Sequence, residues 1–575
     1  MTTTESSFLP ADGWDLAAWR AAFAWPSPDR LNIAEQACTR WASAEPEREA
    51  LRIIDRAGHG TVWTYAALEE ASNRIADGLL KRGVARGDRV AILLPQGAPV
   101  PIAHLATYKI GAIAVPLANL FGPDAIAYRL RHAGAKALVT NEDGVAKLLA
   151  TLADGEAYPD LTTLVTTGNA SVAGPFNAVG WDGLLAEGRP DPVMAKTGPN
   201  DPALMIYTSG TTGSPKGALH AHRIVTGHLP GVTWSHGGMP RAGDRFWTPS
   251  DWAWAGGLLN VLLSGLTLGV PIVGGDIGRF DPEAALELMR REAIRNVFLP
   301  PTALKMLKEA PSEAFEGLAL RSVASGGESL GTATRDWART HLCPVVNELY
   351  GQTEANYLVA SNAEAGTLRE GAIGAAVAGH DLAILDDDGQ ALPAGETGEV
   401  CLRAPDPVMM LRYWEDEAAT RRAFHYAGDE EAADWSDVGR LDGAWLRTGD
   451  RGWLDADGYL TFGGRGDDVI TSAGYRIGPS EIEDCLARHP AVALVAAIGV
   501  PDALRTEIIR AVVVPAEGFT PTPDLAEELR LFARERLSSH QYPREVVFRA
   551  DMPLTTTGKV VRRQLRAEAA EETRA

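Results

Sequence analysis

The sequence predicts an α/β protein with a large N-terminal domain of βαβ-type sheets flanked by helices and a small α+β C-terminal domain. Short apolar runs typical of buried strands, such as residues 89–94, 136–140 and 296–299, alternate with segments of helical periodicity. Strands that are separated by helices favour mostly parallel sheets. A glycine-rich stretch near residue 466 separates about 110 C-terminal residues, a reasonable size for a second domain.

Two segments show how individual elements are assigned. One predicted helix begins at Asp281, which is a typical cap, and continues with Pro282 and Glu283, which suit the first turn. Residues 252–275 carry no charge and are long enough to span a membrane, but six glycines and a proline argue against a transmembrane helix. We predict instead a buried helix, a turn and a buried strand that ends near Val273.

Two polar segments interrupt the alternation of strands and helices. Residues 463–468 read Gly-Gly-Arg-Gly-Asp-Asp, and glycine permits the wide backbone changes that a hinge needs. Composition alone leaves two interpretations open, a hinge between domains and an ordinary hairpin turn. A domain boundary at this point would divide the chain into residues 1–466 and residues 467–575. Residues 428–439 are rich in acidic side chains and predict a surface loop.

The composition excludes several classes of protein. The 575 residues include 54 basic and 75 acidic side chains, and the formal net charge of −21 repels nucleic acid and anionic membranes. The four cysteines are far apart and form no C-x-x-C pair, which argues against a zinc site or a disulfide framework and favours buried thiols. The N-terminal residues lack the apolar core of a signal peptide. We expect a cytoplasmic protein without integral membrane association.

The strongest local motif is Tyr-Thr-Ser-Gly-Thr-Thr-Gly-Ser-Pro-Lys-Gly at residues 207–217, which follows an apolar, strand-like run. Its glycines let the backbone approach a ligand closely, and its hydroxyls and Lys216 are donors for a polyanion. A Walker A loop would have glycine directly before the lysine, whereas Pro215 stands there. The motif predicts a phosphate-binding loop of a different kind.

A second motif indicates a different chemistry. Residues 327–331 read Gly-Glu-Ser-Leu-Gly, which fits the G-x-S-x-G nucleophile elbow of α/β-hydrolases. A strand-like segment precedes it, a helix-like segment follows, and His489 or His540 would complete a triad with an acidic residue. A serine hydrolase with Ser329 as nucleophile is therefore a second hypothesis, although it leaves the loop at residues 207–217 unexplained.

Three further motifs are weak when each is taken alone. Glu354 ends the sequence Tyr-Gly-Gln-Thr-Glu after a strand-like run and is a candidate ligand for nucleotide-bound Mg²⁺. Asp450 ends a Thr-Gly-Asp sequence that predicts a turn, and its carboxylate suits two ribose hydroxyls. Lys559 follows a glycine near the end of the chain. We expect His220 and His222 to pack in the protein rather than bind a metal.

Together these motifs resemble the adenylate-forming superfamily, which includes acyl-CoA synthetases, firefly luciferase and the adenylation domains of peptide synthetases. Seven motifs follow one another in the superfamily's order over most of the chain. They are residues 208–217, 325–330, 350–354, 448–450, 464–470, 474–483 and 553–559. Residues 31–35 and 472–483 look most like the medium-chain acyl-CoA synthetase branch.

The resemblance implies a ligase reaction with ATP, Mg²⁺ and CoA. The carboxylate of a small acid attacks the α-phosphate of ATP to give acyl-AMP and pyrophosphate, and the thiolate of CoA then displaces AMP. In-line attack on phosphorus needs positioning and charge neutralisation more than covalent help. We expect a medium-chain aliphatic, branched or aromatic acid. A carrier-protein thiol or oxygen as acceptor, a nucleotide-sensing module, and a monomer or homodimer are all left open.

The resemblance also implies roles for individual residues. The expected ATP- and AMP-binding residues are Thr208, Ser209, Gly210, Thr211, Thr212, Gly213, Lys216, Gly327, Glu328, Ser329, Tyr350, Gly351, Gln352, Asp450 and Arg465. In this set the 208–216 residues hold the β- and γ-phosphates, Tyr350 stacks on the adenine, and Asp450 and Arg465 bind the ribose. The expected catalytic residues are Lys559, which bridges the carboxylate and the α-phosphate, Thr353, and the Mg²⁺ ligand Glu354.

A movement of the C-terminal domain is implied as well. Asp467 matches the hinge, and rotation about it would remove Lys559 and bring a strand at residues 472–478 to the CoA tunnel. The expected CoA-side residues are Ser472, Ala473, Gly474, Tyr475 and Arg476. Trp254 and Gly326 are assigned to the acyl pocket, and Trp252 to the core. Residues 425–443 look longer than the family needs and are expected to add a surface loop.

Overall fold

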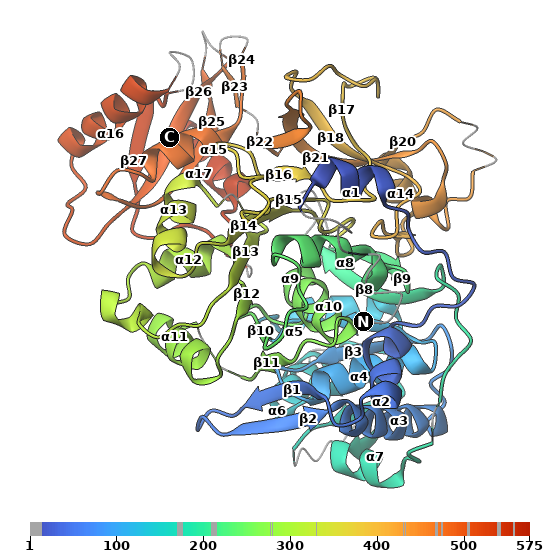
Figure 1. Cartoon of the computed structure of the whole chain (residues 1–575). Helices are drawn as coiled ribbons and strands as arrows, with labels where there is room; N and C mark the ends of the chain where they lie inside the picture. The colour runs from blue at the N-terminus through green and yellow to red at the C-terminus, as the bar shows by residue number, and fades with distance from the viewer. Residues whose placement is uncertain are drawn as a thin grey trace.

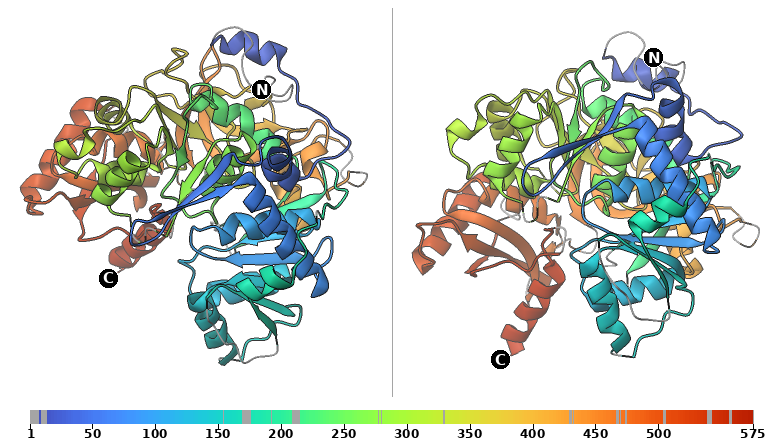
Figure 2. Two further views of the ribbon diagram at one scale, coloured as in Figure 1. Left: turned by 60° about the horizontal axis from the view of Figure 1, so that its bottom comes forward. Right: turned by 90° about the horizontal axis from the view of Figure 1, so that it is seen from below.

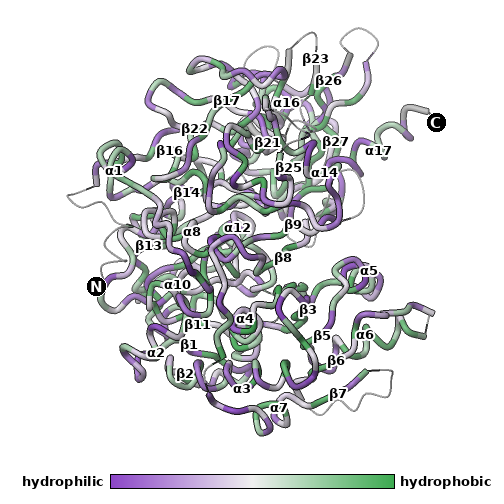
Figure 3. Tube along the Cα trace, turned by 90° about the vertical axis from the view of Figure 1, so that its right-hand side faces the viewer, coloured by the Kyte–Doolittle hydropathy of each residue, from purple (hydrophilic) through white to green (hydrophobic). Residues whose placement is uncertain are grey.

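The computed structural model describes residues 8, 14–153, 155–168, 176–191, 193–208, 215–276, 278, 280–328, 330–428, 431, 433–465, 468, 470–472, 475–502, 506–537, 542–555 and 558–574. Within these residues three β-sheets with flanking helices make up the molecule (Figure 1). Figure 3 shows hydrophobic segments along interior strands, whereas many peripheral turns are hydrophilic. The α/β fold class is confirmed.

The largest sheet contains 14 strands in the described part of the chain. In spatial order they are β17 (Leu382–Leu385), β18 (Gly398–Arg403), β21 (Trp445–Leu454), β22 (Tyr459–Arg465), β16 (Gly374–Ala376), β15 (Val359–Ala360), β14 (Val346–Tyr350), β13 (Ser322–Gly326), β12 (Asn296–Phe298), β10 (Phe246–Trp247), β11 (Ile272–Gly274), β1 (Glu49–Ile54) and β2 (Gly60–Thr64), with β20 (Phe424–His425) beside β21. Strands β14, β13, β12, β10, β11 and β1 are parallel. Their carboxyl ends therefore lie at one edge of the sheet.

The second sheet contains eight described strands and is also largely parallel. In order they are β19 (Arg412–Tyr413), β9 (Lys216–Ala221), β8 (Pro202–Thr208), β4 (Ile113–Pro116), β3 (Arg89–Leu93), β5 (Ala135–Thr140), β6 (Thr163–Thr166) and β7 (Asn177–Gly180). Only β19, β9 and β8 pair antiparallel within this sheet. The strands predicted near residues 89, 136 and 296 are thus confirmed as β3, β5 and β12.

The third sheet belongs to the C-terminal part of the chain. Its described strands are β24 (Tyr475–Ile477), β23 (Ile470–Ser472), β26 (Thr506–Pro515) and β25 (Val492–Asp502), with β27 (Glu545–Phe548) beside β26. The right-hand view of Figure 2 shows this part, in red, set apart at one side of the molecule. Strand β22 belongs to the first sheet and β23 to the third, so these two consecutive strands do not pair with each other.

Helices cover the sheets, and local sequence signals account for several of them. They are α1 (Leu16–Ala22), η2 (Glu35–Thr39), α2 (Arg40–Ala44), α3 (Tyr65–Lys81), α4 (Pro99–Lys109), α5 (Pro123–Ala133), α6 (Glu142–Ala153), α7 (Trp181–Glu187), α8 (Ile224–Ser235), α9 (Ala255–Gly257), η3 (Leu258–Leu263), α10 (Ser264–Thr267), α11 (Pro282–Arg291), α12 (Pro301–Leu307), η4 (Ser312–Phe315), α13 (Thr332–His341), α14 (Glu417–Arg422), η5 (Val438–Arg440), α15 (Pro479–Leu486), α16 (Pro523–Arg536) and α17 (Arg562–Arg574). The predicted cap of α11 is confirmed, because Asp281 accepts a hydrogen bond from the backbone nitrogen of Ala284 at 2.8 Å.

The uncharged run at residues 252–275 folds inside the protein as predicted. It forms the continuous helical stretch α9, η3 and α10, a turn, and the buried strand β11. Gly265 allows close packing there, since a methyl group at that position would lie 2.3 Å from the side chain of Ile272. Within the described residues, every helix is too short or too polar to cross a bilayer.

Three local predictions are wrong. Thr448 and Asp450 lie inside β21 rather than in a turn, because Gly449 takes a φ of 70° at a β-bulge. Residues 472–478 contain a hairpin between β23 and β24 rather than one strand. The acidic segment around residue 435 is not simply a surface loop, because Trp435 and Val438 are buried in a hydrophobic cluster.

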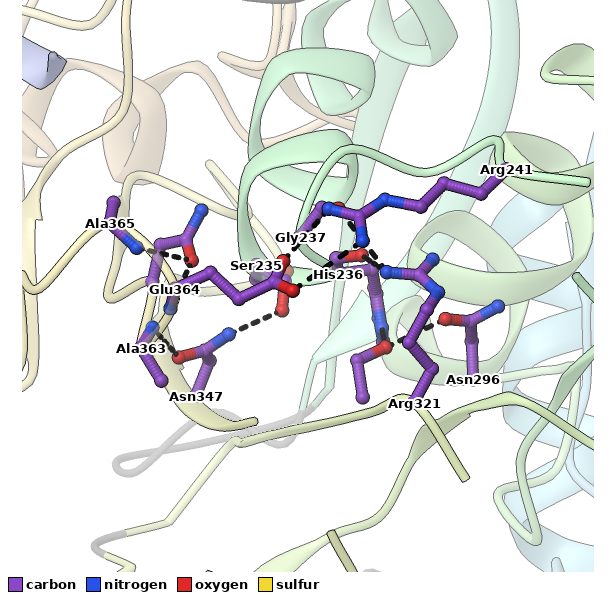
Figure 4. A network of polar contacts seen from close by, with 12 residues as sticks. Ser235, His236, Gly237, Arg241, Asn296, Arg321, Asn347, Ala363, Glu364 and Ala365 are labelled. Carbon is purple, nitrogen blue, oxygen red and sulfur yellow. Dashed lines mark hydrogen bonds and ion pairs between the residues drawn. The ribbon is translucent and has the colours of Figure 1, made fainter. Parts of the chain in front are cut away.

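A buried polar network joins helix α8 to the amino ends of the parallel strands (Figure 4). His236, just after α8, donates through Nδ1 to Ser322 at 2.7 Å, and Ser322 donates to Asn296 at 2.8 Å. Asn347 donates to the carbonyl of Ser235 at 2.6 Å. These contacts hold α8 in place over the sheet, at the edge opposite the carboxyl ends of the strands.

Candidate active site

A cavity of about 2130 Å³ lies at the carboxyl ends of β12, β13 and β14 and extends to the C-terminal segment. Open α/β sheets usually bind ligands at this edge. Thirteen predicted site residues line the cavity: Thr208, Lys216, Trp254, Gly326, Gly327, Glu328, Tyr350, Gly351, Gln352, Thr353, Glu354, Asp450 and Lys559. The structure therefore brings together motifs that are far apart in the sequence.

The phosphate-binding motif begins and ends on two adjacent strands. Thr208 on β8 pairs with Lys216 on β9, so the intervening loop starts and returns at the mouth of the cavity. The ammonium of Lys216 lies 5.0 Å from the centre of the Tyr413 ring, within the range of a cation–π interaction. The predicted residues Ser209, Gly210, Thr211, Thr212 and Gly213 lie outside the described residues.

The candidate Mg²⁺ ligand is positioned by a residue that no sequence motif identified. The hydroxyl of Tyr413 on β19 donates to Glu354 Oε1 at 2.8 Å. The backbone nitrogen of Met410 donates to the carbonyl of Glu354, also at 2.8 Å. These two contacts orient the carboxylate toward the cavity next to Lys216. Tyr413 is 59 residues from Glu354, so only the contact in three dimensions connects them.

A buried carboxyl group, that of Asp450, lies on β21 of the largest sheet. Asp450 is 4% exposed and accepts hydrogen bonds at Oδ2 from the hydroxyl of Tyr350 at 2.7 Å and from Gln352 Nε2 at 2.5 Å. Asp450 also pairs in register with Arg465 on β22, whose side chain lies outside the described atoms. The two hydrogen bonds fix the orientation of this side chain, and a carboxylate is a group that can accept from a pair of ribose hydroxyls.

The C-terminal lysine approaches the same cavity from the other side. Gly558, with a φ of 88°, turns the chain so that a methyl group there would lie 3.3 Å from Thr302 Oγ1. Thr302 donates to Glu328 at 3.0 Å. Burial raises the pKa of Glu328, while the nearby charge of Lys559 acts in the opposite direction. Lys559 and Glu328 are thus close neighbours, although their motifs are far apart in the sequence.

The apolar end of the cavity contains one of the two tryptophans singled out in the sequence. Trp254 is half-buried, lines the cavity and packs edge-on against Phe121 at 5.6 Å between ring centres. Trp252 is 1% exposed and packs on Gly274, which confirms its place in the core. Gly326 also lines the cavity, and a methyl group there would lie 2.5 Å from the carbonyl of Leu349, so only glycine fits.

A titratable group of the wall was missed by sequence reasoning. Glu348 on β14 lines the cavity and accepts a hydrogen bond from the backbone nitrogen of Leu330 at 3.2 Å. Burial raises the pKa of Glu348 to about 7. Its only sequence signal is its place two residues before the motif that ends at Glu354.

The remaining predicted residues are one described side chain, Ser472, and several that lie outside the described part of the chain. Ser472 is buried and does not line the cavity. Ser329, Asp467, Ala473 and Gly474 lie outside the described residues, and the side chains of Tyr475 and Arg476 are not described. His220 and His222 are fully buried, as expected for packing residues.

Two family models match the chain. The model of AMP-binding enzymes matches residues 38–414, and the model of the C-terminal domain of AMP-binding enzymes matches residues 481–559. The first alone covers more than half of the sequence. The two matched regions contain, respectively, the candidate phosphate-binding loop and the lysine that approaches it from the C-terminal side.

Similar proteins and structures cover nearly the whole chain. The acetyl-coenzyme A synthetase of Bacillus subtilis is 30% identical over 94% of this chain and 90% of its own. The mitochondrial acyl-coenzyme A synthetase ACSM2 of Rattus norvegicus is 31% identical over 94% and 92%. The crystal structure of the anthranilate CoA ligase AuaEII with anthranoyl-AMP has a TM-score of 0.83 at 25% identity and covers 95% of this chain and 99% of its own.

Proposed function

The chain belongs to the family of AMP-binding enzymes, and from this we propose that the cavity is the active site of an acyl-CoA synthetase. The chain is an AMP-forming acid–thiol ligase. It activates a carboxylic acid with ATP to acyl-AMP and pyrophosphate, and it then transfers the acyl group to CoA with release of AMP. The comparisons do not favour a carrier-protein acceptor or the serine hydrolase.

One observation carries the assignment of individual roles. Lys559 from the C-terminal segment and Lys216 from the phosphate-binding motif line the same cavity, and Glu354 and Asp450 line it too. Two cations, a buried carboxylate and a second carboxylate held by a tyrosine suit a nucleotide and its metal. The apolar wall around Trp254 suits the body of an organic acid.

In the first step, a carboxylate oxygen attacks the α-phosphorus, and the bond from that phosphorus to the pyrophosphate oxygen breaks. Lys559 stabilises the charge shared by the carboxylate and the α-phosphate, and Thr353 contacts the same phosphate. Lys216 and Thr208 bind the departing phosphates, and Asp450 binds the ribose. The main contribution of the protein is positioning, because the product is a mixed anhydride and needs no covalent enzyme intermediate.

The residues fit a magnesium ion that arrives with the nucleotide. Mg²⁺ keeps several waters and binds proteins through one or two carboxylates together with substrate phosphates. Glu354 provides one such carboxylate, and Tyr413 occupies its Oε1 while Lys216 stands nearby. When bound, the ion would neutralise phosphate charge.

For the second step, we propose rotation of residues 467–575 about Asp467. Asp468 is bound to α17 through Arg566 at 2.9 Å and Arg562 at 3.4 Å, so it already moves with the C-terminal body. Rotation would withdraw Lys559 and bring the hairpin with Ser472, Ala473, Gly474, Tyr475 and Arg476 to the cavity. The CoA thiolate then attacks the acyl carbon, and the bond from that carbon to AMP breaks.

The two-step reaction is the same for many carboxylic acids, so the acid that this enzyme uses is a separate proposal. We propose a medium-size aliphatic, branched or aromatic acid, and a cytoplasmic place of action with free ATP and CoA. A screen of AMP formation with CoA across straight-chain, branched and aryl acids tests this proposal. A result with acetate alone would contradict the size assignment.

Two half-reactions test the roles of the two lysines. Lys559→Ala should abolish acid-dependent exchange of pyrophosphate into ATP, because no other described lysine lies in the C-terminal segment. The same variant should still transfer the acyl group of supplied acyl-adenylate to CoA. Arg563→Ala removes an exposed cation of the same segment that does not line the cavity, and it should retain both activities. Equal loss of both half-reactions in Lys559→Ala would refute the two-state assignment.

A further inference from the structure

Three buried polar side chains form a hydrogen-bonded chain that ends at the cavity. His228 belongs to helix α8, Asn260 to helix η3, and Asn356 to the segment after β14. They are 0%, 2% and 6% exposed, and both asparagines line the cavity. None of the three belongs to a motif that the sequence analysis identified.

The direction of each hydrogen bond follows from the backbone of α8. The carbonyl of Ile224 only accepts, so His228 donates to it through Nδ1 at 2.8 Å. Burial lowers the pKa of His228 to about 4, so the ring is neutral at pH 7 and its Nε2 is an acceptor. Asn356 Nδ2 lies 3.1 Å from that nitrogen and is therefore the donor.

The orientation of Asn260 follows in turn. Asn356 Nδ2 also donates to Asn260 Oδ1 at 2.6 Å. The amide nitrogen of Asn260 and the amide oxygen of Asn356 take no part in these hydrogen bonds. Neither atom has a hydrogen-bond partner in the described part of the chain, and both atoms are accessible to solvent. Because Asn260 is almost wholly buried and lines the cavity, its amide nitrogen faces the cavity.

Gly256 and Phe298 form an apolar part of the cavity wall on the same side as Asn260. Gly256 precedes Asn260 by four residues on the same helical stretch, and a methyl group there would lie 2.8 Å from the ring of Phe298. An apolar acyl group against this wall would bury the two amide atoms without partners, and each such loss weakens a complex. A charged substituent at this place would be buried beside two neutral amides, which carry no charge to compensate it.

Building on the proposed function, we infer that the acid activated by this enzyme carries a hydroxyl group on an otherwise apolar body, and that Asn260 and Asn356 bind this hydroxyl. The hydroxyl oxygen accepts from Asn260 Nδ2, and its proton is donated to Asn356 Oδ1. His228 is a positioning residue, because it sets the orientation of Asn356 without touching the acid. The asparagine pair then selects the substrate by hydrogen bonding rather than by size.

Matched pairs of acids test the inference. AMP formation in the presence of CoA is measured for 2-, 3- and 4-hydroxybenzoate against the corresponding methylbenzoates, and for 6-hydroxyhexanoate against heptanoate. In at least one pair we expect kcat/KM to favour the hydroxy acid by about tenfold or more, since sites that bind a hydroxyl reject analogues without it. Each ratio compares two acids on one enzyme, so a general loss of activity cancels.

Variants connect the ratio to the asparagine. Asn260→Leu keeps the volume but removes the amide, and it should lower the hydroxy-to-methyl ratio by about tenfold or more while improving the use of methyl acids. Asn347→Leu makes the same exchange at a buried asparagine of the amino-end network and should leave the ratio unchanged. If Asn260→Leu does not fold, Asn260→Ser provides the test, because its short hydroxyl withdraws the donor from the cavity.

The outcomes separate this inference from the proposed function. Robust AMP formation with ratios near one for every pair in the wild type would overturn the inference alone. An equal fall of the ratio in Asn260→Leu and Asn347→Leu would overturn it too, because the effect would then be structural. Absence of AMP formation with every acid would overturn the proposed function itself.

Discussion

The two ends of strands β12, β13 and β14 use polar residues in opposite ways. At the amino ends, polar side chains bond to one another and to the end of helix α8 (Figure 4). Ser322 donates to Asn296 and accepts from His236, and Asn347 donates to the carbonyl of Ser235. At the carboxyl ends, the strands stop at Phe298 and Gly326 beside the cavity, and the polar atoms beyond them are left for a ligand. The amino ends of these strands therefore contribute to the stability of the fold, and the carboxyl ends provide groups that can bind a ligand.

The difference has a simple physical basis. Polar groups that are buried in the folded protein need partners, and at the amino ends the protein supplies them. At the carboxyl ends, groups such as Asn260 Nδ2 keep unused hydrogen-bonding capacity. Substitutions at the amino ends should therefore change the free energy of unfolding, and those at the carboxyl ends should change kinetics.

The largest effect is expected at the amino ends. Arg321 donates to Asp244 at 3.0 and 2.7 Å, and the Asp244 side chain is 1% exposed. Arg321→Met leaves this carboxylate buried without its main partner and should lower the free energy of unfolding by about 3–5 kcal/mol. Denaturant melts measure the loss, and the relative kcat/KM for any pair of acids should not change.

A nearby ion pair provides the control for Arg321→Met. Arg241 pairs with Glu364 at 2.9 Å, but both side chains are partly exposed. Arg241→Met should therefore lower the free energy of unfolding by less than about 1 kcal/mol. Similar losses in the two variants would show that burial does not set the strength of this network.

The next effect is expected at the carboxyl ends. Asp450→Asn keeps the shape of the side chain but replaces one carboxyl oxygen, which can only accept from a ribose hydroxyl or from Tyr350 and Gln352, with an amide nitrogen. We expect kcat/KM for ATP to fall about 100-fold, which corresponds to about 2.7 kcal/mol, with the free energy of unfolding nearly unchanged. Asp457→Asn, at an exposed position that does not itself line the cavity, is the matched control. An unaltered kcat/KM for ATP in Asp450→Asn would remove Asp450 from the nucleotide site.

A smaller effect is expected from the tyrosine that holds the candidate metal ligand. Tyr413→Phe removes only the hydroxyl that donates to Glu354. The Mg²⁺ concentration needed for half-maximal adenylation should rise about tenfold, because second-sphere hydrogen bonds orient metal-binding carboxylates. Tyr426→Phe alters a tyrosine that packs on Trp435 outside the cavity and should have no such effect. If both variants keep the wild-type Mg²⁺ requirement, Tyr413 does not position the ion.

The smallest effect concerns stability at the functional edge. The raised pKa of Glu348, about 7, means that its protonated form favours the folded state. This contribution is present at low pH and is lost as the pH rises through 7, so the free energy of unfolding should fall by about 1 kcal/mol between pH 6 and pH 8. Glu348→Gln should flatten that slope, whereas Glu535→Gln, at an exposed site, should not. A slope that persists in Glu348→Gln would assign the titration to another group.

Much of the fold could be predicted because its signals are local. The helix cap at Asp281 needs only the backbone nitrogen of Ala284, three residues away. The strand at residues 89–93 was predicted from the apolar residues within it. Where local signals are ambiguous, prediction failed. Gly449 suits a turn and a β-bulge equally well, because both need positive φ, and only pairing with β18 decided for the bulge. The acidic segment likewise buries Trp435 because a hydrophobic cluster lies beside it.

By itself, the sequence determined the order of strands and helices, the phosphate-binding motif and the lysine at position 559, since each is written in adjacent residues. Only the tertiary structure decided that Tyr413 holds Glu354 and that Asn356 turns the amide of Asn260 toward the cavity. Those pairs are 59 and 96 residues apart. Their chemistry depends on distances and hydrogen-bond directions of a few ångströms, and these arise only when the sheets and helices pack.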